Sequence, residues 1–258
     1  MNAFLQFLHA RSVGFVSALT GLMLLPVVGV SLFSHGTVLL PLLAVLLVSA
    51  VGTEAIFRLL RHQPLTAHAI TTALLLAVLL PADMALWQAA TMTILGVILA
   101  DMMFGGRGFG FLNAAILSAV LVLVSFPGTG LAVLTDQHAV AAVPAILLLL
   151  FTDLLPWRAL GAFALACLVL ATGNPDVFVS AAGALLVGAV FCLCDPFASA
   201  QTRIGQILQG LLAASLFVSL GGPEAPATET MIRAVLLTAL FVPLIDQLVQ
   251  MIGRRANV

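Results

Sequence analysis

The feature that most constrains this chain is a succession of apolar segments, each close to the length that crosses a lipid bilayer and separated by short breaks. A transmembrane helix needs about 20 mostly apolar residues. Residues typical of turns stand in the breaks, as at Gly173-Asn174-Pro175. The sequence therefore predicts an all-α integral membrane protein with about ten transmembrane helices, at residues 13–33, 37–60, 66–81, 85–103, 111–127, 138–154, 157–173, 177–194, 204–221 and 231–252.

The composition agrees with this interpretation and excludes several classes of function. Of the 258 residues, 62% are hydrophobic and 7% are charged, whereas a soluble domain carries about 25% charged residues. The breaks are too short to hold a soluble domain, so we expect residues 1–258 to form a single polytopic membrane domain. The chain lacks the basic face of a nucleic-acid-binding protein, the spacing of a catalytic triad and a Cys/His metal cluster. We therefore expect neither a catalytic residue nor a metal site.

The arginines test the number of helices independently. With the N-terminus in the cytoplasm, only Arg233 of the nine basic residues falls outside. The others, all on the inner side, are Arg11, Arg58, Arg61, Arg107, Arg158, Arg203, Arg254 and Arg255. The positive-inside rule demands such a bias. We therefore expect a multi-pass protein with both termini in the cytoplasm.

The ten segments divide into two halves of five. Repeat one covers residues of about 13–128 and repeat two covers about 138–252. The third segment of each half is short and ends at a proline, Pro81 or Pro196. An odd number of crossings in each half would invert the second half relative to the first, and interrupted segments at matching positions indicate a site between inverted repeats. The alternative is that a hydrophobic chain can be cut into similar halves by chance.

Few acidic groups lie within or beside the predicted helices, where burial of a charge is costly. Glu54 precedes Arg58 by four residues, which predicts an ion pair on one helix face. Asp101, Asp153 and Asp195 each precede an arginine by five to eight residues and are predicted to be charges at the inner surface.

Three further features carry polar groups. Asp246 lies deepest of the acids, so it either meets a structural partner on another helix or belongs to an ion pathway. Asn113 stands where the fifth helix opens and is predicted to cap it. The glycine-rich run 105–110 before that helix predicts a tight turn or a close approach of a ligand or a partner.

The stretch from Thr71 to Phe126 resembles a known family. It follows the pattern T-x-LLLA-x-x-[IL]-P, then YGGxGxNPFNPA, then a helix that ends in SFP. The matching residues are Thr72, Pro81, Gly105, Gly106, Gly108, Asn113, Ala115 and Ser125-Phe126-Pro127; further matches are Glu54-Ala55, Cys194-Asp195-Pro196, Thr202, Gly205 and Pro243 with Asp246. These motifs are similar to those of the RnfD/NqrB family, which comprises RnfD of Rnf electron-transport complexes and NqrB of the sodium-pumping NADH:quinone reductase (Nqr).

The resemblance implies a fold similar to that of urea transporters, with two inverted five-helix repeats. It also implies a membrane subunit of a complex in the bacterial inner membrane. In that complex, electron transfer from ferredoxin or NADH is coupled to movement of sodium ions or protons, and other membrane and redox subunits are the partners. A non-covalent riboflavin or flavin mononucleotide (FMN) would lie at Thr72, Gly105, Gly106, Gly108 and Asn113. The ion path would use Asp246, Asp195, Glu54 and Asp101.

The chain departs from the family at one loop. Family members attach FMN covalently to a threonine in a D-G-x-S-x-A-T segment between the fifth and sixth helices. Here Asp136-Gln137-His138-Ala139-Val140 contains no acceptor threonine, so covalent FMN is not expected. This departure leaves two alternatives open: a stand-alone channel or carrier for a small solute or ion, and a structural partner that seats other subunits.

Overall fold

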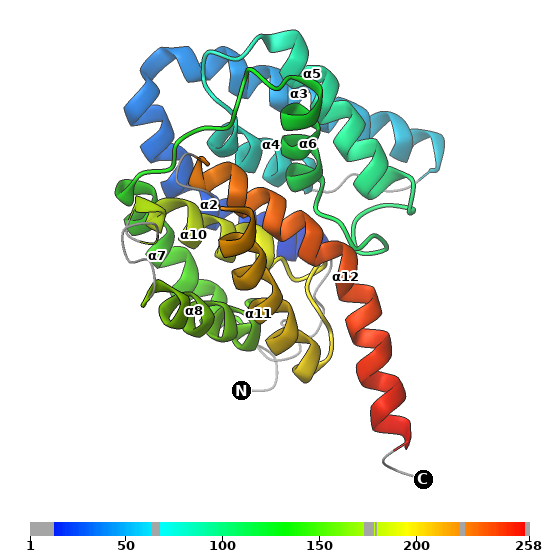
Figure 1. Ribbon diagram of the computed structural model, residues 1–258. Helices are drawn as coiled ribbons and strands as arrows, with labels where there is room; N and C mark the ends of the chain where they lie inside the picture. The colour runs from blue at the N-terminus through cyan, green and yellow to red at the C-terminus, as the bar shows by residue number, and fades with distance from the viewer. Residues whose placement is uncertain (1–12, 63–67, 173–177, 179, 222–224, 256–258) are drawn as a thin grey trace.

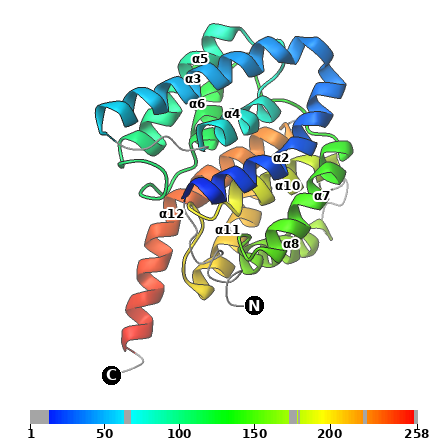
Figure 2. The ribbon, with the colours of Figure 1, turned by 180° about the vertical axis from the view of Figure 1, so that it is seen from behind.

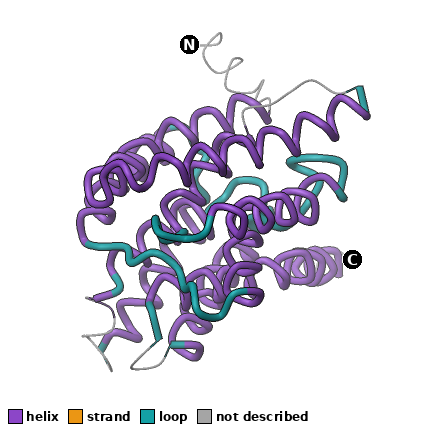
Figure 3. Tube along the Cα trace, turned by 90° about the horizontal axis from the view of Figure 1, so that it is seen from above, coloured by secondary structure: helices purple, strands orange, loops and turns teal. Residues whose placement is uncertain are grey.

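The computed structural model describes residues 13–62, 68–172, 178, 180–221 and 225–255, and within these ranges the regular structure is helical (Figure 3). The elements are α2 (Val13–His35), η1 (Gly36–Val38), α3 (Leu39–Leu60), α4 (His68–Leu79), α5 (Leu86–Val97), η2 (Ile98–Met102), α6 (Ala114–Ser125), α7 (Asp136–Phe151), α8 (Trp157–Ala171), α10 (Ala182–Val187), η3 (Gly188–Leu193), α11 (Arg203–Leu220) and α12 (Ala227–Arg255). Each of the predicted segments overlaps one of these helices. Parts of the predicted segments 66–81, 157–173 and 177–194 lie outside the described residues.

Length and apolarity identify three stretches that could cross a membrane: Gly14–Leu60, Arg203–Leu220 and Ala227–Ile252. The other described helices are apolar but shorter, with 10–17 residues for each continuous helical run. The described part of the chain is therefore that of a helical membrane protein. The number of crossings stays a prediction.

The helices of the two halves gather on opposite sides of the molecule (Figure 1). Helices α3, α4, α5 and α6 lie in the upper part of that view, and α7, α8, α10 and α11 lie in the lower part. Two helices join the halves: α2 packs against α4 and α7, and α12 packs against α11 and α6. The view from behind shows α2 running along the boundary between the halves (Figure 2).

Several helix contacts of the first half have a counterpart in the second half. Helix α5 packs against α3 and α6, as α11 packs against α8 and α12. Likewise, α2 packs against α4 as α7 packs against α10.

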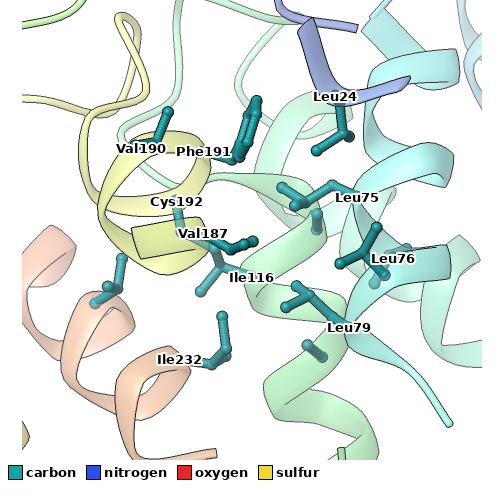
Figure 4. Close-up of a cluster of buried hydrophobic side chains, with 14 of the residues drawn as sticks. Leu24, Leu75, Leu76, Leu79, Ile116, Val187, Val190, Phe191, Cys192 and Ile232 are labelled. Atoms are coloured by element: carbon teal, nitrogen blue, oxygen red, sulfur yellow. The ribbon is translucent and has the colours of Figure 1, made fainter. Parts of the chain in front are cut away.

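The third helix of each half forms the centre of the molecule. Every residue of α4 except Ile70 is buried, and η3 is buried along its whole length. A helix that is apolar on all sides is expected in such a position. Leu75, Leu76 and Leu79 of α4 point toward the α10–η3 segment, and Ile116 of α6 lies between the two (Figure 4). The apolar core is therefore shared by both halves.

Two helices lose their regular hydrogen bonding near their ends. Helix α5 continues as the π-helical segment η2, and α10 continues as the π-helical segment η3. A π turn changes which side of the helix the following residues face, and such turns are frequent at functional sites. Asp101 lies within η2, and Asp195 follows η3 after one residue.

Candidate functional site

A buried polar network connects the two halves between α4 and η3. We call it the inter-half network; its members are His68, Thr72, Asp101, Arg107, Asn113 and Asp195. Only Asp195 of these six comes from the second half, and it is 4% exposed. Polar groups at this depth are costly unless they bond to one another, so the network is the first candidate for a functional site.

Asp195 anchors the network from the second half. Nη2 of Arg107 lies 2.7 Å from each of its two carboxylate oxygens, and Nδ2 of Asn113 lies 2.7 Å from Oδ2. The ring of Phe197 lies 5.1 Å from Cζ of Arg107, within the range of a cation–π interaction. The guanidinium therefore bonds to an anion and packs on an aromatic face at the same time.

The glycine-rich turn gives Arg107 this position. Gly105, Gly106 and Gly108 have φ values of +105°, +116° and +94°, which residues with a side chain rarely adopt. The turn places the guanidinium of Arg107 within hydrogen-bond distance of Asp195. It is followed by Asn113, whose Oδ1 accepts a hydrogen bond from the backbone N–H of Ala115 at 2.9 Å. The predicted tight turn and the predicted helix cap at Asn113 are both confirmed.

His68 is the first residue of α4 and has the largest number of partners in the network. Its Nε2 lies 2.9 Å from Oδ2 of Asp101, 3.2 Å from Oγ1 of Thr72 and 3.2 Å from Nη1 of Arg107. The side chains of His68 and Asp101 are 5% and 3% exposed, so this pair is nearly shielded from solvent.

A second ion pair lies beside the network. Glu54 and Arg58 of α3 form the predicted salt bridge, and both residues are buried. Oε2 of Glu54 also accepts a hydrogen bond from the backbone N–H of Ala69 at 3.0 Å. The carboxylate thereby satisfies a free donor in the first turn of α4, where the helix dipole favours negative charge.

The prediction that Asp101 and Asp195 are inner-surface charges is wrong. They are 2% and 4% exposed, and their carboxylates bond to His68 and to Arg107 with Asn113. Asp153 alone of the three is exposed, in the turn after α7.

Asp246 lies apart from the inter-half network. Its carboxylate oxygens accept hydrogen bonds from the backbone N–H groups of Gln201 and Thr202, at 2.7 and 3.0 Å, and from the hydroxyl of Thr202. Thr202 is the N-terminal cap of α11. Asp246 therefore has a structural partner on another element, which was one of the two roles predicted for it; its place on an ion path stays a prediction.

The inter-half network encloses a small cavity. About 20 Å³ of it is open to the centre of a water-sized sphere, which is room for about one water molecule. Its polar lining comes from Thr20, His68, Thr71, Thr72, Arg107, Asn113 and Asp195. Pockets for small organic molecules have volumes of about 300–1,000 Å³. Thr72 and Asn113 line this cavity, and the flavin site predicted at these residues and at Gly105, Gly106 and Gly108 stays a prediction.

The sequence pattern predicts functional roles for several of these residues but not for His68 and Arg107. It places His68 only at a helix end, and Arg107 only at the inner surface. The signal that could have found His68 is its spacing from Thr72, because residues four apart share one helix face. No local pattern predicts that Arg107 meets Asp195, which is 88 residues away.

The sequence of the chain is similar to those of membrane proteins from redox complexes. The sequence model described as the NQR2, RnfD, RnfE family matches residues 7–142 and 129–253. The chain is 25% identical over 275 residues to the D subunit of the Na(+)-translocating ferredoxin:NAD(+) oxidoreductase complex of Acetobacterium woodii, an alignment that covers 87% of this chain and 85% of that relative.

Two other relatives are longer than this chain. It is 25% identical over 253 residues to the B subunit of the Na(+)-translocating NADH-quinone reductase of Pseudomonas paraeruginosa, covering 76% of this chain and 63% of the relative. It is 35% identical over 119 residues to the D subunit of the ion-translocating oxidoreductase complex of Escherichia fergusonii, covering 44% and 33%. The aligned parts thus span less than two thirds of either of these relatives.

Proposed function

Because the chain belongs to the NQR2, RnfD, RnfE family, we propose that it is a membrane subunit of an Rnf- or Nqr-like ion-translocating redox complex. The observation that carries the proposal is the family match, which extends over residues 7–142 and 129–253. The relatives named above are subunits of ion-translocating oxidoreductases, so the partners of this chain are other membrane and redox subunits of such a complex.

The architecture in this proposal is two inverted five-helix repeats, of about residues 13–128 and 138–252, with ten crossings of a bacterial inner membrane. The corresponding contacts of α5 and α11 with their neighbours support the repeats. The positions of the arginines support cytoplasmic termini.

The role of this chain in the complex is to supply the scaffold and part of the ion path. Asp101 and Asp195 belong to the path because they are buried carboxylates at the boundary between the halves. Glu54 joins them through the first turn of α4. Asp246 would belong to a separate part of the path, near the start of α11.

Covalent FMN has no place in this proposal. The segment between α6 and α7 ends at Thr135, whose hydroxyl and backbone N–H contact Nδ1 of His138 at 3.0 and 3.2 Å. This threonine caps α7, and the absence of covalent FMN stays an expectation from the sequence of residues 136–140. A non-covalent riboflavin or FMN at Thr72, Asn113 and the turn with Gly105, Gly106 and Gly108 remains part of this proposal.

The test is isolation of the tagged full chain from its native membrane in a mild detergent. We expect redox subunits to be present in the eluate, identified by mass spectrometry and by iron–sulfur or flavin absorption. A tagged membrane protein of unrelated family serves as the control. A lone, colourless protein that moves a solute into vesicles would overturn the proposal and favour a carrier.

A further inference from the structure

We propose that the inter-half network exchanges a proton rather than Na⁺, and that His68 and Asp101 form the pair that holds this proton. The inference deepens the proposed function, because it rests on the assignment of an ion path to Asp101 and Asp195. The proposed ion is a proton, whereas the names of two relatives describe them as Na(+)-translocating.

The carboxylates of the network face nitrogen donors. Asp101 faces Nε2 of His68 at 2.9 Å, and Asp195 faces Nη2 of Arg107 and Nδ2 of Asn113 at 2.7 Å. Hard cations such as Na⁺ require several oxygen ligands. The guanidinium already occupies the position at Asp195 where a cation would bind, and it repels a second positive charge. The chemistry around these carboxylates therefore favours a proton.

His68 can form two hydrogen-bond patterns without a backbone movement. A proton on Nε2 of His68 makes a hydrogen bond to Oδ2 of Asp101, which lies 2.9 Å away. When that proton leaves, Nε2 becomes an acceptor. Nη1 of Arg107 and the hydroxyl of Thr72 both lie 3.2 Å from it and can then donate to it. Each protonation state thus has its own partners in place.

The buried charges around His68 are compatible with one exchangeable proton. The charged groups around His68 are Glu54 with Arg58, Arg107 with Asp195, and Asp101. The first two pairs are neutral, so an imidazolium at His68 neutralises Asp101. Loss of the proton leaves one net negative charge at the N-terminus of α4, where the helix dipole lowers its cost. Both states are therefore accessible in a nearly dry site.

The small cavity gives the proton a neighbouring acceptor. It has room for about one water molecule within its 20 Å³ and is lined by His68, Thr72 and Asp195. On release, the proton passes from Nε2 to this water, and a neutral imidazole with a proton on Nδ1 remains. Nδ1 is buried and has no hydrogen-bond partner among the described residues. The contacts of Nε2 alone therefore decide between the two states.

The test uses the full chain in lipid nanodiscs with ¹⁵N-labelled histidine. The His68 signals are assigned by their loss in His68→Gln, and His35→Gln, at an exposed helix end, is the matched control. We expect the His68 signals to change from the imidazolium to the neutral form as the pH is raised. The change should be the same in sodium chloride and in choline chloride of equal concentration. An absence of this change overturns the inference.

Binding of radioactive sodium to the wild-type chain gives a second readout that does not depend on a variant. We expect no saturable binding. Saturable binding would overturn the proton assignment but leave the redox-complex assignment standing. Conversely, proton exchange at His68 in a chain that isolates without redox partners would overturn the proposed function and leave the proton site standing.

Discussion

Arg107 and Asp195 stand 88 residues apart in the sequence, yet Nη2 of Arg107 lies 2.7 Å from both carboxylate oxygens of Asp195. Their side chains are 8% and 3% exposed. This ion pair crosses the boundary between the halves and connects the glycine-rich turn to the end of η3. It therefore contributes both to the assembly of the fold and to the candidate site.

Loss of either partner of this pair should destabilise the protein strongly. Arg107→Gln or Asp195→Asn is expected to lower the free energy of unfolding by about 3–5 kcal/mol, because an uncompensated charge stays buried. Arg233→Gln is the control: it breaks the pair with Glu229, in which the Arg233 side chain is 44% exposed, and should cost at most about 1 kcal/mol. Titration with sodium dodecyl sulfate measures both. Equal costs would contradict a buried, coupled pair, and the double variant should recover part of the loss.

Replacement of Asn113 should separate its two roles. Asn113→Ala removes the helix cap and the bond to Asp195, so we expect a loss of about 1.5–3 kcal/mol. Asn113→Asp keeps an acceptor for Ala115 but places a second carboxylate against Asp195, so it should be the more destabilising variant. Thermal unfolding in detergent ranks the two. The opposite order would mean that the cap outweighs the bond to Asp195.

Asp246 is expected to act through hydrogen bonds to the start of α11. Asp246→Ala should lower the free energy of unfolding by about 1.5–3 kcal/mol because backbone donors lose a charged acceptor. Asp246→Asn should cost less, and Gln247→Ala, at an exposed position on the same helix, should change little. If Asp246 also carries ions, Asp246→Asn will reduce ion movement in vesicles that contain the whole complex while stability stays near that of the wild type.

Helices α8 and α11 should tolerate no side chain at their closest approach. A Cβ at Gly210 would lie 2.8 Å from the backbone nitrogen of Phe163 and also contact the carbonyl oxygen of Ala159. Gly210→Ala should therefore cost about 1–3 kcal/mol. Gly161→Ala in α8 is the matched control, since a Cβ there meets nothing within 4 Å, and it should stabilise the helix by up to about 1 kcal/mol. Similar effects at both positions would argue against this close packing.

The ten-crossing topology predicts which exposed turns face each side of the membrane. In a variant without Cys167, Cys192 and Cys194, we expect Asp83→Cys to react with a membrane-impermeant maleimide in intact cells. Asp153→Cys should react only after the inner membrane is permeabilised. Both positions are exposed, so accessibility within the fold does not decide the result. Reaction of both in intact cells would exclude the predicted topology.

Much of the helical structure could be predicted from the sequence, because it follows from local chemistry. Apolar segments of nearly bilayer length form helices, and glycine or proline ends them, so α2, α3, α7 and α11 lie close to their predicted positions. The cap at Asn113 and the ion pair between Glu54 and Arg58 were also predicted, because their partners are at most four residues away.

Tertiary structure alone decided which polar groups meet. His68 and Asp101 are 33 residues apart, and Arg107 and Asp195 are 88 apart. Asp101 lies within η2 and Asp195 follows η3 after one residue, and both carboxylates are buried where the two halves meet. The hydropathy of the sequence shows where a charged side chain would have a high free-energy cost of burial. The partner that offsets this cost is determined by how the two halves pack together.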